Sequence, residues 1–314
     1  MKIICNPTTY GGKAKDRWPE YDKALKEAGF EYEVEWTTER NHAIDIARKA
    51  SDDHELIVAF GGDGTVNEVI TGIAQAGYKS TIGILPVGRG NDSAFNIRQT
   101  KNLDDLIEML QLNEHRVIDC VKVNDGERYT MSVGGAGLDA DVAVQTSTKS
   151  TRLSYNIALY NSFFRYRPRH MLIDIDDGKE VRDIRSLTTM VGNGQRISDG
   201  LMVTPNAVID DGLLDIMIVG NTTIMESLIV STRLRKGTHL THPKIDIVQG
   251  KRVSITSLDD KKVYGHVMGE YLGELPYTFE VEHKVLKILK MSDSVIERED
   301  WKAAETFSEK INKK

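Results

Sequence analysis

The chain has 314 residues, of which 40% are hydrophobic and 28% are charged, and its formal net charge at pH 7 is −6. This composition is typical of a folded globular protein, and the acidic balance argues against nucleic acid as the main partner. The length exceeds the usual size of one domain, so we expect two domains that share a cleft.

Cysteine content and hydropathy predict the cellular setting. Cys5 and Cys120 are too few for a disulfide framework, which favours a reducing compartment. The N-terminal stretch MKIICNP has too short an apolar run for a signal peptide, and the chain has no run of about eighteen apolar residues. We therefore expect a cytoplasmic protein without a membrane-spanning segment.

The first third of the chain alternates short apolar runs with helical patterns. Strands are predicted at 2–5, 32–38, 56–60 and 81–88, and helices at 17–29, 41–52, 66–77 and 103–111. Gly29 closes the first of these helices, and Asn41 caps the second. Strands and helices that alternate at this spacing are typical of a parallel sheet covered on both faces. Residues 1–119 are therefore interpreted as a doubly wound α/β domain.

From about residue 117 the pattern changes to short β-rich segments separated by turn residues. Such a pattern is typical of an antiparallel sandwich. Residues 120–293 are therefore predicted to form a second, β-rich domain, with helices near 153–164 and 223–234. The charged tail looks helical, and we expect residues 294–314 to fold back on the first domain.

A glycine-rich turn, GGDG at 61–64, lies between a predicted strand and a predicted helix. Thr65 followed three residues later by Glu68 matches a capping box, which predicts that the helix begins directly after the turn. Free N–H groups at a helix N-terminus bind phosphate, and glycines let its oxygens approach the backbone. Asp63 would repel a phosphate unless a cation intervenes, so we expect it to help hold Mg²⁺. The alternative is a simple glycine turn with a capping aspartate.

A second glycine-rich turn, in LPVGRGNDSAF at 85–95, follows the next predicted strand. Turns after successive parallel strands lie along one edge of the sheet, where ligands bind. Asp63 and Asp92 are therefore expected on neighbouring turns. One turn would hold phosphates and the other would help to organise a metal and the acceptor.

Six segments, in order along almost the whole chain, resemble the soluble diacylglycerol kinase family of lipid kinases, which also includes sphingosine and ceramide kinases. They are NPTTYGGKA near the start, GGDGTVNEV, LPVGRGND, VGNG at 191–194, TPNAVIDDGLLDI at 204–216 and GEYLGELP at 269–276. The resemblance implies a nucleotide-binding α/β domain, a β-rich second domain, and transfer of the ATP γ-phosphate to a lipid hydroxyl in the cleft between them. Diacylglycerol, which would give phosphatidic acid, is the first expectation for the acceptor.

Two other hypotheses stay open. NAD kinases share GGDGT, although the GRGND and DDGLLD segments follow the order of the lipid kinases. The non-enzymatic hypothesis is a regulator that binds a nucleotide but has lost turnover. It is motivated by Met268, which stands where the family commonly has an aspartate.

By position in the six segments, the resemblance implies roles for individual residues. The implied ATP site comprises Asn6, Thr38, Gly61, Gly62, Asp63, Gly64, Thr65, Asn67, Glu68, Gly88, Arg89, Asn91 and Asp92. A metal site is implied at Asp211 with the carbonyls of Val208 and Leu213, and Asp119 matches an acidic member of the metal and water network. Glu270 matches the general base of the family, and Asp63 would organise Mg²⁺–ATP.

Each implied role has a simpler alternative. Residues 208–213 could form only a tight turn between strands, and Glu270 could be an ordinary solvated side chain. The second turn also departs from the family pattern, because Arg89 and Ser93 replace the usual threonine and phenylalanine. Arg89 could contact a phosphate or reflect a different acceptor geometry.

A lipid acceptor requires contact with a bilayer. FFRYRPRH at 163–170 places Arg165, Arg167 and Arg169 among aromatic residues, and RLRKGTH at 233–239 adds positive charge. Each basic residue near an anionic membrane contributes about 1 kcal/mol to binding. We therefore expect peripheral association with an anionic membrane, the alternative being a solvated loop or an oligomer contact. A homodimer is expected from the family alone.

Overall fold

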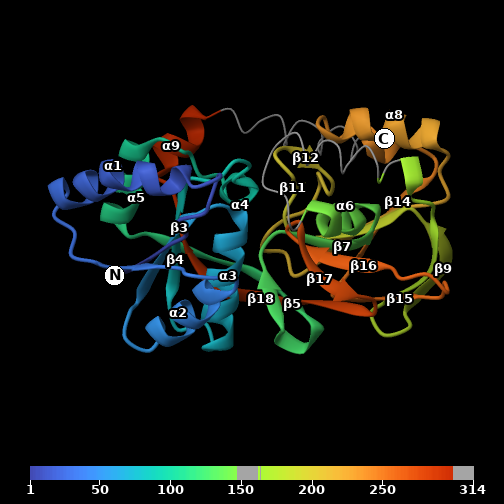
Figure 1. Ribbon diagram of the computed structural model, residues 1–314, viewed down its shortest axis with the longest axis horizontal. Coiled ribbons are helices and arrows are strands. Elements are labelled where there is room, and N and C mark those ends of the chain that lie inside the picture. Colours follow the sequence, from blue (N-terminus) through green and yellow to red (C-terminus); the bar gives the residue numbers. More distant parts are fainter. Residues whose placement is uncertain (147–161, 163, 300–314) are drawn as a thin grey trace.

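The computed structural model describes residues 1–146, 162 and 164–299 (Figure 1). The helix predicted near 153–164 therefore lies almost wholly outside the described residues, as does the tail from residue 300. Figure 1 shows two domains side by side, with the N-terminal domain on the left and the β-rich domain on the right.

Four strands that pair in parallel form the centre of the first domain, in the order β2 (Glu33–Trp36), β1 (Lys2–Cys5), β3 (Leu56–Gly61), β4 (Thr81–Pro86). Helices α2 (His42–Ala50) and α3 (Asp63–Gln75) pack on one face of the sheet. Helices α1 (Lys13–Glu27), α5 (Leu103–Leu112) and α9 (Asp293–Arg298) pack on the other face. The predicted doubly wound α/β domain is confirmed.

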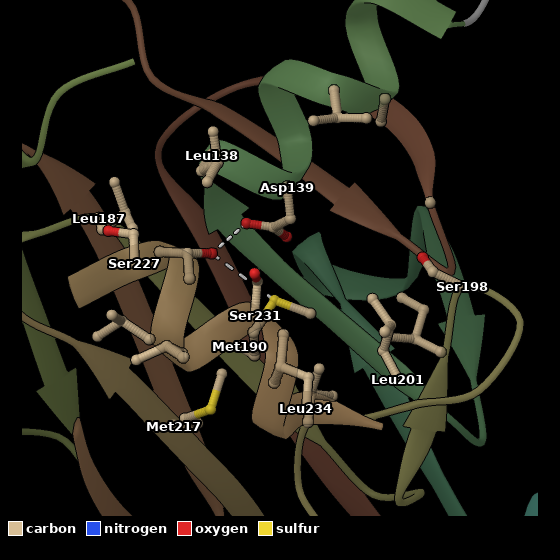
Figure 2. Close-up of a pocket in the computed structure, with 18 of the residues that line it drawn as sticks. Leu138, Asp139, Leu187, Met190, Ser198, Leu201, Met217, Ser227, Ser231 and Leu234 are labelled. Atoms are coloured by element: carbon tan, nitrogen blue, oxygen red, sulfur yellow. Dashed lines mark hydrogen bonds between the residues drawn. The ribbon is translucent and has the colours of Figure 1, made fainter. Parts of the chain in front are cut away.

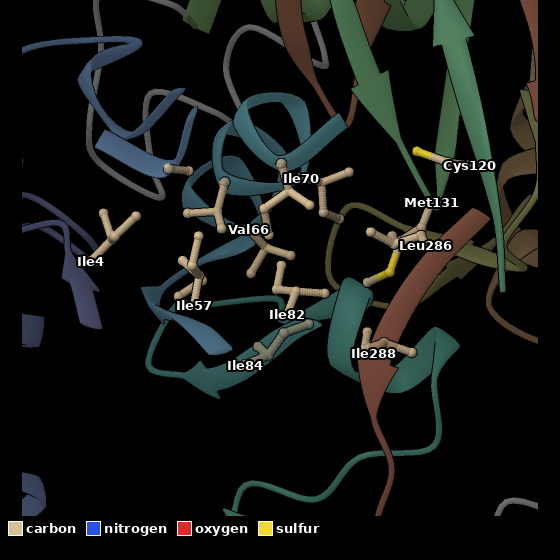
Figure 3. Packing of buried hydrophobic residues seen from close by; sticks show 14 of the residues in the cluster. Ile4, Ile57, Val66, Ile70, Ile82, Ile84, Cys120, Met131, Leu286 and Ile288 are labelled. Atoms are coloured by element: carbon tan, nitrogen blue, oxygen red, sulfur yellow. The ribbon is translucent and has the colours of Figure 1, made fainter. Parts of the chain in front are cut away.

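Periodic apolar residues explain why α3 packs where it does. Val66, Val69, Ile70 and Ile73 recur at helical spacing and are fully or almost fully buried. They meet the isoleucines of the sheet, such as Ile57, in one cluster (Figure 3). The same cluster continues into strands that lead to the second domain. A shared core therefore holds α3 in a defined position relative to both domains.

The capping box predicted at Thr65 and Glu68 is wrong. Helix α3 begins at Asp63 with Gly62 as its N-cap, so the glycine turn itself forms the first helical turn. Glu68 instead accepts hydrogen bonds from the backbone N–H groups of Asn41 (3.1 Å) and of the second residue of α2 (3.2 Å). Asn41 occupies the predicted N-cap position of α2, but its own side chain makes no capping hydrogen bond. The α3 glutamate therefore caps the neighbouring helix.

The helix predicted at 17–29 also begins earlier than expected. Gly11 and Gly12 have φ values of 67° and 91°, so they turn the chain sharply after β1. This turn allows α1 to begin at Lys13. A short helix, α4 (Asp92–Asn96), follows the second glycine turn.

Two packed antiparallel layers form the second domain. One sheet has the order β14 (Ile245–Gly250), β13 (Leu214–Val219), β10 (Thr188–Gly192), β7 (Val133–Gly137), β16 (Tyr264–Val267), β17 (Glu270–Glu274). The facing layer contains β8 (Arg169–Ile175), β9 (Glu180–Ser186), β15 (Arg252–Ser257) and the first part of β18 (Tyr277–Leu289). Apolar residues from both layers share one core, which confirms the predicted sandwich.

Helices and short strands complete the second domain. Helix α6 (Leu138–Thr146) follows β7, and α8 (Ile224–Leu234) lies on the outer side of the domain (Figure 1). The helix predicted near 223–234 is thereby confirmed, and Thr223 with Glu226 forms a true capping box at its start. The remaining strands are β5 (His115–Val123), β6 (Arg128–Thr130), β11 (Arg196–Ile197) and β12 (Leu201–Met202).

Strand β18 joins the two domains. Its first residues pair with β15, its last residues pair with β4 at Ile288 and Ile82, and β5 runs antiparallel along most of its length. The sheet of the first domain therefore continues into the second. The boundary predicted between residues 119 and 120 falls inside β5. In the described part of the tail, Arg298 forms an ion pair with Asp105 of the first domain at 2.6 Å.

Candidate active site

Two glycine turns pack against each other at the carboxyl edge of the parallel sheet. A Cβ atom on Gly88 would lie 2.5 Å from the Cα of Gly62, so only glycine permits this contact. The Asn91 side chain accepts a hydrogen bond from the N–H of Gly88 and donates one to its carbonyl oxygen, both at 2.8 Å. Together the turns present one continuous backbone surface beside the N-terminus of α3.

The two aspartates of these turns have different surroundings. Asp63 Oδ1 accepts a hydrogen bond from the N–H of Ser93 at 2.7 Å. Asp92 is 2% exposed, and its carboxylate binds the Arg196 guanidinium and the N–H groups of Asp199 and the next residue. Burial raises the pKa of Asp92, and the Asp63 charge adds to this rise against the opposing hydrogen bonds. Asp92 therefore ties the second turn to the second domain instead of facing the open cleft.

Glu270 reaches the first glycine turn from the other domain. Its Oε1 lies 2.7 Å from the place where a Cβ atom on Gly64 would stand. It lines a polar cleft of about 420 Å³ together with Asn6, Thr38 and Glu68. The residue predicted as the base and the turn predicted to hold phosphate are therefore neighbours, although 206 positions separate Glu270 from Gly64 in the sequence.

The electrostatics of the cleft favour a proton acceptor at Glu270. Burial raises its pKa, and the nearby Arg40 and Arg128 cations only partly oppose this rise. Burial also raises the pKa of Glu68, and the negative charge of Glu270 adds to the effect. A carboxylate with a raised pKa is a better base near neutral pH than an ordinary glutamate.

A tight hairpin turn places Glu270 at the cleft. Met268 and Gly269 are its central residues, both with positive φ (51° and 76°), and Val267 pairs with Glu270 across the turn. Two left-handed residues define the type I′ geometry that suits a two-residue hairpin. The Met268 N–H donates a hydrogen bond to the carbonyl of Val133 at 2.9 Å, and the Met268 sulfur accepts one from the N–H of Val133. Met268, where this chain departs from the family pattern, therefore fastens the turn to β7.

A buried contact between a histidine and an aspartate supports the same turn from below. His266 is 1% exposed, its Nε2 contacts Asp139, and its Nδ1 accepts a hydrogen bond from the Gly269 N–H at 3.1 Å. The proton of a neutral imidazole then sits on Nε2, toward Asp139. Burial alone would raise the pKa of Asp139, but His266 and a hydrogen bond from Thr188 lower it overall. The pair positions the turn that carries Glu270.

No pattern in the sequence predicts this contact between His266 and Asp139. His266 and Asp139 are 127 positions apart, and neither belongs to a segment that carries a recognisable motif. Only the pairing of β16 with β7, which ends directly before α6, brings them together. A local sequence signal for the pair does not exist.

An apolar cavity of about 550 Å³ adjoins the polar cleft inside the second domain (Figure 2). Gly269 and Ala143 line both spaces, so the two meet beside Glu270. Asp139 and Thr188 supply polar groups to the wall, joined by a hydrogen bond. Most of the wall is apolar and comes from α6, β10, β13 and α8, including Leu138, Val142, Met190, Met217, Val219 and Leu234.

The loop at 208–213, predicted to bind a metal, is held in place by Asp119. This carboxylate is fully buried and accepts a hydrogen bond from the Gly212 N–H at 2.7 Å. Asp211 accepts from the N–H of Leu213 at 3.0 Å, and its pKa is raised by burial and by the Asp119 charge. Among the described residues, no three His, Cys, Asp or Glu side chains are grouped to hold a metal ion. Metal binding by Asp211, with the carbonyls of Val208 and Leu213, stays a prediction.

The other residues predicted for the ATP site differ in their access to the cleft. Those that line the polar cleft are Asn6, Thr38 and Glu68. Those that line a hollow of about 220 Å³ over the glycine turns are Gly62, Gly64, Thr65, Gly88 and Arg89. Gly61, Asn67 and Asn91 are buried. The residues that line either space are placed to contact a ligand, and Gly61, Asn67 and Asn91, which line neither, support the site.

Comparison with known proteins identifies the family. The diacylglycerol kinase catalytic domain matches residues 1–123, and the YegS C-terminal NAD kinase beta sandwich-like domain matches residues 132–290. The chain belongs to the diacylglycerol kinase family. Membership makes it a kinase, for which positioning and charge neutralisation supply most of the catalysis.

Relatives within the family cover almost the whole chain. A diacylglycerol kinase of Staphylococcus saprophyticus is 29% identical over 284 residues, which is 88% of this chain and 91% of the relative. One from Staphylococcus carnosus is 28% identical over 282 residues, or 88% and 90%. The crystal structure of a diacylglycerol kinase from Bacillus anthracis str. Sterne has the same fold, with a TM-score of 0.69 at 21% identity over 94% of this chain and 97% of that one.

Proposed function

We propose that this kinase transfers the γ-phosphate of ATP to the free hydroxyl of diacylglycerol and forms phosphatidic acid. The observation that carries the proposal is the junction at Gly269, where the polar cleft meets the apolar cavity. A nucleotide needs the polar space and acyl chains need the apolar one. Diacylglycerol carries a free hydroxyl on the glycerol that joins two such chains, and the two relatives described above are named diacylglycerol kinases.

The glycine turns are suited to the phosphates of ATP. The first N–H groups of a helix have no partner within the helix, and their positive end attracts anions. At the start of α3 these groups belong to residues 63–65, beside the hollow that Gly62 and Gly88 line. Arg89 lines the same hollow and adds a positive charge.

In this proposal Asp63 holds Mg²⁺ beside the phosphates. Its Oδ1 accepts from the Ser93 N–H, whereas Oδ2 has no hydrogen bond among the described residues. One carboxylate with the phosphate oxygens and water is the usual ligand set of Mg²⁺ in kinases. The cation would neutralise phosphate charge during transfer.

Glu270 acts as the general base in this proposal. It takes the proton of the acceptor hydroxyl while that oxygen forms a bond to the γ-phosphorus, and the bond between the γ-phosphorus and the bridging oxygen breaks to release ADP. A positioned base contributes about 10²–10⁴-fold to such a reaction. Glu270 lies beside the junction of the cavity and the cleft, so it can reach the glycerol hydroxyl of a lipid whose acyl chains lie in the cavity.

Transfer of label from γ-labelled ATP to separate acceptors tests the function. Diacylglycerol, sphingosine, ceramide and NAD would each be supplied to the parental protein and to the Glu270→Gln variant as the blank. We expect labelled phosphatidic acid from the parent. Label mainly in sphingosine or ceramide would reassign the lipid, and label in NAD would favour the NAD kinase hypothesis. ATP binding without any transfer would favour a regulator.

A further inference from the structure

Helix α8 presents an apolar stripe to solvent, where a surface helix normally shows polar side chains. Met225, Leu228 and Ile229 are 67%, 38% and 42% exposed. They occupy positions i, i+3 and i+4 of the helix, so they lie on one face. The cavity side of the same helix carries Ser227 and Ser231 (Figure 2). The helix therefore shows apolar groups outward, whereas its cavity side mixes these two serines with the apolar Val230 and Leu234.

The stripe is continuous with the rim of the apolar cavity. Leu228 belongs to the stripe and also lines the cavity. Phe164 is 38% exposed and lines the cavity as well, so it extends the apolar rim. Ten large apolar side chains are exposed among the described residues, and four of them are Phe164 and the three of the stripe. Apolar side chains gathered in this way indicate an interaction surface, whereas isolated exposed apolar residues need no such explanation.

Charge accompanies the apolar surface. Arg235 and Lys236 follow α8 directly, Arg165 and Arg167 follow Phe164, and all four are exposed. The acidic residue of α8, Glu226, caps the helix and forms an ion pair with Lys244 at 2.8 Å, so its charge is offset. The surface is therefore apolar and locally basic on a chain whose net charge is −6.

One residue of the predicted basic patch lies differently. Arg169 stacks on the ring of Tyr166, with its guanidinium carbon 5.2 Å from the ring centroid. It begins β8 and is only partly exposed. Arg165 and Arg167 are the members of that patch available to a surface.

We propose that α8 and Phe164 dock this kinase on an anionic bilayer, with the rim of the apolar cavity against the membrane. An amphipathic helix with an apolar face and flanking cations is the element that binds such an interface. In this arrangement acyl chains pass from the bilayer into the cavity without crossing water. The inference rests on the proposed function, because a cavity that opens to the membrane can take up an acceptor there only if that acceptor is a lipid.

Vesicle binding without ATP or diacylglycerol tests the docking separately from catalysis. The test variant is Met225→Gln with Ile229→Gln, because these side chains do not line the cavity and glutamine is a good helix former. The matched control is Leu112→Gln with Val181→Gln, which removes two apolar side chains exposed by 45% and 51% elsewhere. Vesicles of phosphatidylcholine with phosphatidylserine, and of phosphatidylcholine alone, supply the surfaces.

We expect the test variant to lose about tenfold or more in affinity for the anionic vesicles, while the control binds like the parent. ATP affinity and turnover of a soluble short-chain diacylglycerol should stay at parental levels. Parental binding by the test variant would overturn the assignment to α8. Equal binding of the parent to neutral and anionic vesicles would overturn the role of charge. If the parent fails to bind any vesicle yet phosphorylates the short-chain lipid, docking is wrong and the proposed function survives.

Discussion

Replacing Gly64 with alanine tests the contact between the glycine turn and Glu270. Gly64 is the second residue of α3, where a helical backbone suits alanine. The added Cβ atom would lie 2.7 Å from Glu270 Oε1, against about 3.4 Å for ordinary contact, so the carboxylate must move by about 0.7 Å. The Glu270 carboxyl is the group that the new methyl would meet within 4 Å.

This displacement predicts a loss of rate with little change in stability. Misplacing a reacting group by about 1 Å costs as much as 10²-fold in rate, so we expect kcat to fall by about 10- to 100-fold. The fold should be unharmed, because only the end of one side chain shifts. Alanine in place of glycine in a helix adds about 0.5–1 kcal/mol to the free energy of unfolding. The melting temperature should therefore stay level or rise.

A double-mutant cycle separates this effect from a clash with the nucleotide. In the Glu270→Gln background, Gly64→Ala should reduce kcat very little further, because the displaced group is no longer a base. Direct titration of ATP should give similar dissociation constants for all four proteins. If the two substitutions reduced kcat independently, so that their losses multiplied in the double variant, the reasoning would be refuted. The new methyl group would then act on the nucleotide and not on Glu270.

Three further predictions concern the metal, the pKa of the base and the acceptor. Asp63→Asn keeps the acceptor for the Ser93 N–H but removes a charge, so turnover should vanish without a fall in melting temperature, and a near-normal kcat would contradict its role. Arg40→Gln removes a cation that lowers the pKa of Glu270, so the acidic limb of kcat/KM should move to higher pH, because the base is protonated sooner as pH falls; an unmoved limb would argue against Glu270. Met217→Trp fills part of the cavity and should raise KM for long-chain diacylglycerol while leaving ATP affinity unchanged; equal KM values for parent and variant would place the acyl chains elsewhere.

The order of strands and helices could be predicted wherever short-range periodicity reflects burial. Val66, Ile70 and Ile73 repeat at helical spacing because one face of α3 meets the sheet. Helix starts were less predictable. Thr65 and Glu68 match a capping pattern, yet Glu68 finds its donors on α2, a contact that tertiary packing decides.

Long-range features of the site could not be predicted from local patterns. The resemblance to a known family pointed to Glu270, but no spacing rule predicts that its carboxylate lies beside Gly64 of the other domain. The predicted boundary at 119–120 falls inside β5, and no local pattern shows that the neighbouring β18 pairs with strands of both domains. The support of His266 by Asp139 likewise depends on strand pairing between distant segments.

The most direct test of the account is the turnover of the Glu270→Gln variant with diacylglycerol, with ATP affinity measured separately by equilibrium binding. Glutamine keeps the size of the side chain but cannot take the proton. We predict that kcat falls by about 10²–10⁴-fold while the ATP dissociation constant stays close to the parental value. Turnover near the parental rate would contradict the account, since the proton would then leave through another group.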